Sequence, residues 1–494
     1  MVVYRKGHKL DLCAIDHSKQ AAQGWRKSLV HQDRTLRELF AESLRDKNIN
    51  TRPFATPAAP AQEKYNQSFQ WEIYGTTMGP YITPTEYTAW WDESIALRSS
   101  AMLGDWSFLA KYRIAGPDAR RFVDYACTKD MTRQKLNQIY FTPMVDQEGR
   151  VAMEGLFFRL GEDEYIFTDG PPIEWFKQLQ TIKEFDVSID DVTPDYSVYQ
   201  LQGPRCFDVL ESMTRQNFHD LKFSRGRWIK YRDYDVYISR QGVTGELGFE
   251  IMAPVDGKKA PIAVLLWDAL AEAGKDFDLR MVGNKARRIG HVEAGIPTRR
   301  FDYTRAIPSG DMAADRFDRE KFAAGKKVSA LDTASQYATP AELGWDYLVD
   351  LDRDFYGREA LKKEKEFGGP SRKMTGLIWN SDDVISLFAG LFGVADRPLP
   401  PSLPRQSQPL WLRIMEGSEF IGWATSPTYS PTLRRLISFG RMNRQLCEPG
   451  EEVRLEYCDH RGATTIIRAA VTDLPFIPHQ RSKDMSKEKS ILEP

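Results

Sequence analysis

The sequence predicts an α+β fold followed by a separate all-β domain, and three observations support this prediction. Short strand-like runs, for example at 198–201 and 235–238, alternate with amphipathic helical stretches such as 261–274. From about Gly417 onward, β-branched and aromatic runs separated by turns replace this alternation, as at 464–467. The chain has 494 residues, which is enough for two to four compact units at roughly 100–200 residues per domain.

The N-terminal end has the pattern of an extension. Residues 35–45 have a helical pattern, whereas residues 51–63 are rich in proline and poor in periodic apolar residues, which predicts a linker. The first residues become charged before an apolar stretch of signal-peptide length can form, so we expect a cytoplasmic protein. These features predict an N-terminal extension at 1–80 and a first α+β domain at 81–368.

The C-terminal third has the pattern of a β domain with a charged end. Residues 396–409 are rich in proline and predict a long loop. We place the all-β domain at 369–480, because the strand-like runs lie within this range. The polar and charged residues at 481–494 predict a disordered tail.

The overall composition excludes several classes of protein. Lys and Arg total 68 and Asp and Glu total 69, and this balance argues against a protein that reads the nucleic-acid backbone. The apolar runs are well short of the ~18 residues that a membrane span requires. The five cysteines and seven histidines are scattered, so we expect neither a disulfide framework nor a metal site.

Five ordered stretches have a recognisable pattern. They are EYTAWWDESIALRSSAMLGDWS at 86–107, a strand-turn-strand at 139–155, LQGP at 201–204, SRQGVTGELGFEI at 239–251 and VGNKARRIGHVEAGIP at 282–297. Together they resemble the folate-binding aminomethyltransferase superfamily, which includes the glycine-cleavage T-protein and the tetrahydrofolate-dependent O-demethylases. DFYGREAL at 354–361 and a TSPTYSPTL run at 425–433 extend the resemblance, which covers about residues 81–475.

The resemblance implies a fold and a cofactor. The expected fold is a T-protein-like, multi-lobed folate-binding domain of antiparallel sheets with helices, followed by a C-terminal β-barrel. The expected cofactor is tetrahydrofolate, whose pterin the signature glutamate, Glu246, would bind because a carboxylate accepts two N–H donors. The glycines at 242, 245 and 248 would let the backbone approach a flat ligand, and Val243 stands where relatives have a tyrosine.

Three residues are candidates for catalysis. Glu154 lies where the family's hairpin usually has an aspartate near the reacting centre, although a salt-bridged strand residue is an equal alternative. Tyr140 could stack on the pterin or donate a hydrogen bond, and a packed core tyrosine is the alternative. His291 could donate a proton to a leaving oxygen, because an unperturbed histidine has a pKa of about 6.5.

Other residues are candidates for binding. Arg240 and Arg287 could hold the folate glutamyl tail or an aromatic carboxylate, or they could form structural pairs. Tyr429 is a further candidate for the folate site. We expect Trp106, Phe108 and Asp169 to line the substrate side of the pocket.

The length and the PYITPTEY entry at 80–87 resemble the methoxyarene O-demethylases more than the shorter T-proteins. We therefore expect transfer of a methyl group from a small methoxylated aromatic acid, or a similar donor, to N5 of tetrahydrofolate. The alternatives are a glycine-cleavage aminomethyltransferase and a non-catalytic folate-binding protein. The expected partner is a small-molecule methyl donor, with neither nucleic acid nor membrane, and the protein would be a monomer or a homodimer.

Overall fold

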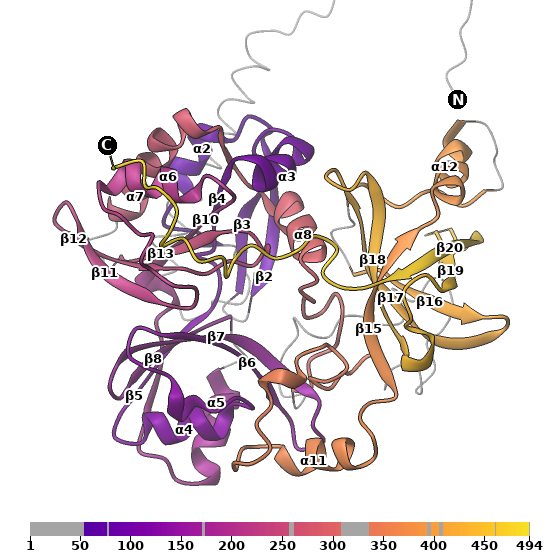
Figure 1. The fold of residues 1–494 in the computed structure, drawn as a ribbon, viewed down its shortest axis with the longest axis horizontal. Helices are drawn as coiled ribbons and strands as arrows, with labels where there is room; N and C mark the ends of the chain where they lie inside the picture. Colours follow the sequence, from indigo (N-terminus) through magenta and orange to yellow (C-terminus); the bar gives the residue numbers. More distant parts are fainter. Residues whose placement is uncertain are drawn as a thin grey trace, which may run out of the picture.

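The computed structural model shows three lobes around a common centre (Figure 1). It describes residues 54–76, 79–169, 173–255, 261–307, 335–392, 397–404, 409–459 and 461–493. The helical stretch expected at 35–45 lies outside these residues. Among the residues described, no helix is both long and apolar enough to cross a membrane.

The first lobe is built on a six-stranded sheet with the order β11-β12-β13-β10-β4-β14. Its strands are β4 (Ala101–Asp105), β10 (Tyr196–Gln202), β11 (Gly226–Tyr231), β12 (Tyr234–Ser239), β13 (Gly248–Pro254) and β14 (Leu279–Met281). Its helices are α2 (Ala59–Tyr65), α3 (Trp90–Ser99), α6 (Cys206–Thr214) and α7 (Pro261–Ala273). Helices α2, α6 and α7 cover one face of the sheet, where residues such as Leu201, Phe249 and Ile251 form the core.

A small sheet joins the N-terminal residues to this lobe. Its strands are β1 (Phe54–Ala55), β2 (Gln70–Thr76) and β3 (Gly79–Glu86), in the order β1-β3-β2. Strand β3 contains residue 80, the expected end of the N-terminal extension, and pairs with β2. The described residues before position 80 are therefore part of the folded lobe.

The second lobe contains a five-stranded sheet with the order β6-β7-β8-β5-β9. Its strands are β5 (Lys111–Ala115), β6 (Ile139–Val145), β7 (Val151–Gly161), β8 (Glu164–Thr168) and β9 (Ser188–Asp191). Helices α4 (Ala119–Ala126) and α5 (Ile173–Ile182) cover one face, where Phe157, Phe167 and Phe176 pack together.

The uncovered faces of the two sheets approach each other. One apolar cluster contains Met102, Val198 and Met252 from the first sheet together with Ile139, Phe158 and Ile166 from the second. The two lobes therefore share a core, and polar residues on these same faces point into the space between the sheets.

The third lobe is a closed antiparallel barrel with the order β15-β18-β17-β16-β19-β20. Its strands are β15 (Arg372–Trp379), β16 (Trp411–Glu416), β17 (Glu419–Ser430), β18 (Arg435–Asn443), β19 (Glu452–Cys458) and β20 (Thr464–Thr472). Helix α8 (Asn284–Glu293) lies between the first lobe and the barrel, α11 (Arg358–Glu366) lies beside the second lobe, and α12 (Ser381–Ala389) packs on the barrel (Figure 1). The α+β fold with a C-terminal barrel is confirmed.

The structure differs from two sequence-based expectations. Residues 59–63 of the expected linker lie in helix α2, because a proline is tolerated in the first helical turn and Ala61 is buried. The expected disordered tail instead lies along the first lobe, which the chain reaches from the barrel before residue 481 (Figure 1). It is held by His219 Nδ1, 2.9 Å from the carbonyl oxygen of Glu488, and by Ser490, whose hydroxyl donates to Glu211 at 2.6 Å. The composition of the tail showed that it is polar, but it could not show that the tail has these buried partners.

Candidate functional site

Two acidic side chains point into the space between the two sheets. Glu250 of β13 lies opposite Gln200 of β10, while its chain neighbours Phe249 and Ile251 belong to the helix-covered core. Because side chains alternate along a strand, Glu250 faces the second lobe. Glu154 of β7 shares its face with Phe158, which belongs to the cluster between the sheets. The two carboxyl groups therefore enter the same space from opposite sides.

Glu154 is buried and accepts a hydrogen bond from a tyrosine. The hydroxyl of Tyr303, which follows α8 in the chain, donates to Glu154 Oε2. Burial raises the pKa of Glu154 to about 7, although the positive charge of Arg299 opposes the shift. The carboxyl group can therefore hold a proton near neutral pH.

Asp169 lies close to both acids. It follows β8 with φ of 74°, and its carboxylate pairs with Arg299 Nη2 at 2.5 Å. Its negative charge raises the pKa values of Glu154 and of Glu250. The charge of Asp169 therefore acts on both of the facing acids.

Glu250 is the residue that the sequence signature did not single out. Burial raises its pKa to about 7, while the nearby Lys111 favours the ionised form. Gln200 Nε2 donates to Glu250 Oε1. Burial also lowers the pKa of Lys111 to about 8, and its Nζ donates to the backbone oxygens of Ser107 at 2.9 Å and Leu109 at 2.7 Å.

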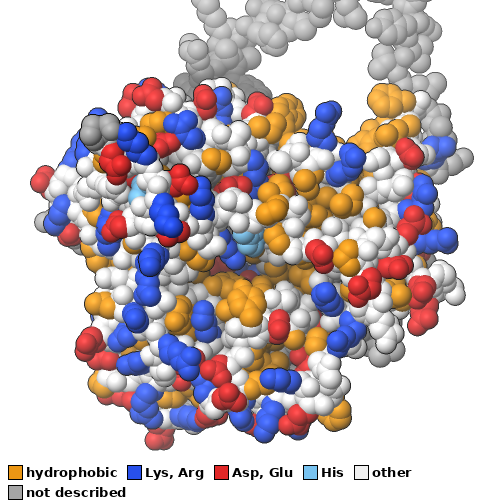
Figure 2. Space-filling view, in the orientation of Figure 1, with side chains coloured by type: hydrophobic (Ala, Val, Ile, Leu, Met, Phe, Trp, Pro, Cys, Tyr) orange, Lys and Arg blue, Asp and Glu red, His pale blue; other side chains and the backbone are white. Residues whose placement is uncertain are grey.

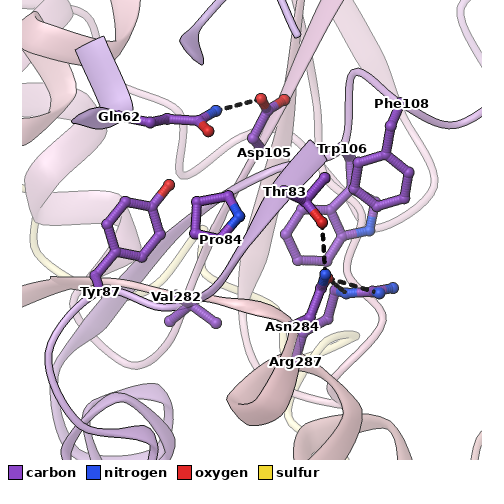
Figure 3. Close-up of a pocket in the computed structure, with 10 residues that line it drawn as sticks. All are labelled: Gln62, Thr83, Pro84, Tyr87, Asp105, Trp106, Phe108, Val282, Asn284 and Arg287. Atoms are coloured by element: carbon purple, nitrogen blue, oxygen red, sulfur yellow. Dashed lines mark hydrogen bonds between the residues drawn. The ribbon is translucent and has the colours of Figure 1, made fainter. Parts of the chain in front are cut away.

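The loop held by Lys111 carries the two expected pocket aromatics. Trp106 and Phe108 line a narrow pocket with Arg287 of α8 (Figure 3). The Arg287 guanidinium lies 5.6 Å from the Trp106 ring and 5.4 Å from the Phe108 ring. Asn284 Oδ1 accepts from Arg287 Nε at 3.1 Å, which orients the guanidinium. The structure thus brings three predicted residues together on one wall.

Glu246 lies in a different environment. Its Oε1 accepts from Arg98 Nη1 at 2.9 Å, and the same guanidinium pairs with Glu293 at 2.8 Å. Glu293 in turn accepts from the Ser430 hydroxyl of β17 at 2.5 Å. This buried network joins the signature loop, α3, α8 and the barrel, so the Glu246 carboxylate is already paired within the protein.

The glycines of the signature loop lie against side chains of the protein itself. A Cβ at residue 242 would lie 2.9 Å from Gln202 Oε1, and one at residue 248 would lie 2.5 Å from Gln202 Cγ. Gly245 has φ of +79°, and a Cβ there would lie 2.6 Å from His479 Cδ2. In this structure, the backbone of the loop therefore approaches the side chains of Gln202 and His479 closely.

Replacing Arg98 with methionine is expected to destabilise the protein by ~3–5 kcal/mol, because Glu293 would remain as a buried charge without its cation. Arg98 and Glu293 have side-chain exposures of only 8% and 0%. Denaturant unfolding would measure the loss. The exposed pair Arg121–Asp118 provides the control, since Arg121→Met should change stability far less. Equal stability losses in the two variants would contradict a structural role for this network.

Three other predicted residues, Tyr140, Arg240 and Tyr429, lie away from the facing acids. Tyr140 pairs with Phe157 on the opposite face of the second sheet from Glu154, and Lys129 Nζ lies 3.9 Å from its ring. Arg240 is buried and donates to backbone oxygens of the C-terminal tail. Tyr429 packs edge-on against Trp90 at the interface of the barrel and α3, with ring centroids 6.3 Å apart.

The remaining predicted residues are His291 and Val243. His291 lies near the end of α8, with Nδ1 3.5 Å from the Thr298 hydroxyl. Val243 packs at the edge of the apolar cluster between the sheets. Asp169 thus lies near Glu154, and Trp106 packs in the apolar cluster between the sheets, whereas Glu246, Tyr140, Arg240 and Tyr429 lie elsewhere.

The sequence contained a usable signal for only some of the missed residues. Glu250 is the penultimate residue of the signature at 239–251, and its alternation with Phe249 and Ile251 places it on the strand face opposite to theirs. Lys111, Arg299 and Tyr303 lie in no recognised motif, and only the fold brings them to the acids. Within the described ranges, no group of three or more His, Cys, Asp or Glu could hold a metal ion.

Comparisons with known proteins agree with this architecture. Residues 67–317 match the family model described as the GCVT N-terminal domain, and residues 394–477 match the glycine cleavage T-protein C-terminal barrel domain. The crystal structure of glycine cleavage system aminomethyltransferase T from Bartonella henselae superposes with a TM-score of 0.64 at 20% identity. The match covers 87% of this chain and 99% of that chain.

Several curated proteins are similar over most of their length. The sesamin methylene transferase of Sinomonas sp. (strain No.22) is 26% identical over 433 residues, which cover 81% of this chain and 92% of that protein. The aminomethyltransferase of Alkaliphilus metalliredigens is 29% identical over 384 residues, covering 76% and 87%. The probable aminomethyltransferase of Pyrococcus abyssi is 26% identical over 410 residues, covering 79% and 90%.

Proposed function

The chain belongs to the glycine cleavage T-protein family, whose members use tetrahydrofolate, and from this premise we propose that it is a tetrahydrofolate-dependent methyltransferase. The proposed reaction moves a methyl group from a small methoxylated aromatic acid, or a similar donor, to N5 of tetrahydrofolate. The observation that carries this proposal is the pair of buried acids, Glu154 and Glu250, that enter one space from two facing sheets.

The residues between the sheets fit a reduced folate. The pterin edge presents adjacent N–H donors, and Glu250 supplies a buried carboxylate with lone pairs to accept them. The apolar cluster beside it, with Val198, Met252 and Phe158, suits the flat ring. This chemistry supports Glu250 in the role that the resemblance implied for Glu246.

The protein's contribution to methyl transfer is positioning and proton supply. Tetrahydrofolate supplies a nucleophilic N5, to which the methyl group moves when its bond to the donor oxygen breaks. Holding the two reactants in line can lower the barrier by ~7–11 kcal/mol. Glu154 holds a proton near pH 7 beside Tyr303, so it can protonate the oxygen that loses the methyl group. The proton that N5 releases balances the one that the oxygen gains.

The pocket of Trp106, Phe108 and Arg287 supports an aromatic acid as donor. The two aromatic side chains suit a flat ring, and a guanidinium binds a carboxylate well. Trp106 also belongs to the apolar cluster between the sheets, so this wall is continuous with the space that contains Glu250.

The direct test is to incubate the protein with tetrahydrofolate and a panel of methoxybenzoates, then to identify the folate product by mass spectrometry. The proposal expects 5-methyltetrahydrofolate and the matching hydroxybenzoate in equal amounts. Formation of methylene-tetrahydrofolate only with an aminomethylated lipoyl carrier protein would favour the aminomethyltransferase function that several relatives' names give. Tight folate binding without any product would favour a non-catalytic folate-binding protein.

The sesamin methylene transferase supports including other small compounds in the panel. Its name specifies sesamin, rather than a carrier protein, for the transfer of a methylene group. We therefore add O-, S- and N-methyl compounds to the panel, and a product from any of them would identify the donor class.

A further inference from the structure

A line of hydrogen-bonded side chains leads from the signature loop to Glu250. The Thr244 hydroxyl donates to Gln202 Oε1 at 2.5 Å. Gln202 Nε2 donates to Gln200 Oε1, and Gln200 Nε2 donates to Glu250 Oε1. We call these three residues, Thr244, Gln202 and Gln200, the amide relay.

The residues of the amide relay are buried, and their hydrogen bonds all run in the same direction. Thr244, Gln202 and Gln200 have no exposed surface, and Glu250 is 5% exposed. Each donor points toward Glu250, so the successive dipoles present their positive ends to its carboxylate. A carboxylate that accepts such a bond is stabilised in its ionised form against the cost of burial.

The far end of the relay is fixed by the buried ion network. The Thr244 carbonyl accepts from Arg98 Nη1 at 2.8 Å, and the same nitrogen donates to Glu246. Gln202 lies against Gly242 and Gly248, where any Cβ would collide with it. The signature loop therefore sets the position of Thr244 and Gln202, and this explains why a glycine-rich loop lies beside a buried amide.

The charged groups that face Glu250 come from two other elements. Lys111 at the start of β5 favours the ionised carboxylate, and Asp169 after β8 disfavours it. Lys111 also lies near Asp105 and Asp191, which favour its own charged form. These charges act on Glu250 whether or not Thr244 donates, so the contribution of the relay can be measured separately.

We propose that Thr244, Gln202 and Gln200 are positioning residues that keep the Glu250 carboxylate ionised and oriented toward the space between the sheets. The inference rests on the proposed function only for the identity of the ligand, a reduced folate. The relay itself is a property of the protein without ligand.

The first test therefore uses the ligand-free protein. Infrared difference spectroscopy over a pH titration would follow the carboxyl stretch that is lost in Glu250→Gln. We expect Thr244→Val, which keeps the shape of the side chain but removes the hydroxyl, to raise the titration midpoint by about half a pH unit or more, a threefold change in the proton-binding constant. Thr244→Ser should restore the wild-type midpoint.

A second variant and a control make the result specific. Gln200→Leu removes the bond to Glu250 directly, so it should shift the midpoint further than Thr244→Val. Thr142→Val is the matched control, because Thr142 is a buried strand residue of the second lobe whose hydroxyl donates to the Pro143 carbonyl at 3.0 Å. It should leave the midpoint of Glu250 unchanged.

The ligand test is calorimetry with tetrahydrofolate under anaerobic conditions. Thr244→Val should weaken binding about twofold or more at pH 7 and approach the wild-type dissociation constant at pH 8.5, where Glu250 is ionised in both proteins. An unchanged midpoint in both Thr244→Val and Gln200→Leu would overturn the inference. A shifted midpoint in a protein that binds no folate would retain the relay and overturn the proposed function.

Discussion

Glu250→Gln is expected to weaken the binding of tetrahydrofolate by about 10- to 100-fold, because hydrogen bonds to a charged group contribute about 1.5–3 kcal/mol. The amide has nearly the same shape as the carboxylate, but it offers one acceptor oxygen to the two N–H groups of the pterin edge. Isothermal titration calorimetry with the reduced folate would measure the change. In the wild-type protein, affinity should fall as the pH is lowered through about 7, because the Glu250 carboxylate becomes protonated.

Glu246→Gln is the matched comparison for this experiment. Glu246 lies four residues earlier in the same signature, but its carboxylate pairs with Arg98. The substitution should therefore reduce the stability of the protein and change the folate dissociation constant by less than threefold or so. If Glu246→Gln weakened folate binding and Glu250→Gln did not, the assignment of the two acids would be reversed.

Glu154→Gln is expected to reduce kcat by ~10²–10³-fold with a much smaller effect on folate affinity, because general acid catalysis typically contributes ~10²–10⁴-fold. Glutamine keeps the contact with Tyr303 but cannot supply a proton to the leaving oxygen. Single-turnover assays with the donor found in the panel would measure the effect. The wild-type kcat should fall as the pH rises through about 7, since Glu154 then loses its proton.

The Tyr303→Phe variant separates catalysis from orientation. It removes the hydroxyl that holds Glu154 Oε2 but leaves the carboxyl group in place. We expect an intermediate loss of kcat and a shifted pH profile. Wild-type turnover in Glu154→Gln would instead make Glu154 a structural strand residue, the alternative that the sequence left open.

The periodic patterns predicted the fold better than they predicted the irregular segments. The strand-like runs at 198–201 and 235–238 lie within β10 and β12, and the helical run at 261–274 corresponds to α7. The linker and tail predictions failed because both used composition alone. Helix α2 is held by burial against the first lobe, and the tail by hydrogen bonds to His219 and Glu211, which lie far away in the sequence.

The candidate site could be predicted only where one motif carried the information. The sequence indicated Glu154 and the Trp106 wall, since each lies in a recognisable strand or entry segment. It could not distinguish Glu246 from Glu250, because both acids lie in one signature and their partners, Arg98 and Gln200, are distant in the chain. Strand alternation separates them only after the sheet register is known.

The measurement that tests this account most directly is a crystal structure of the protein with tetrahydrofolate bound. We predict electron density for the pterin between β13 and β7, with its amino-pyrimidine edge on the Glu250 carboxylate and its N5 side toward Glu154. Density for the pterin beside Glu246 and Arg98, or density confined to a surface away from both sheets, would contradict the account.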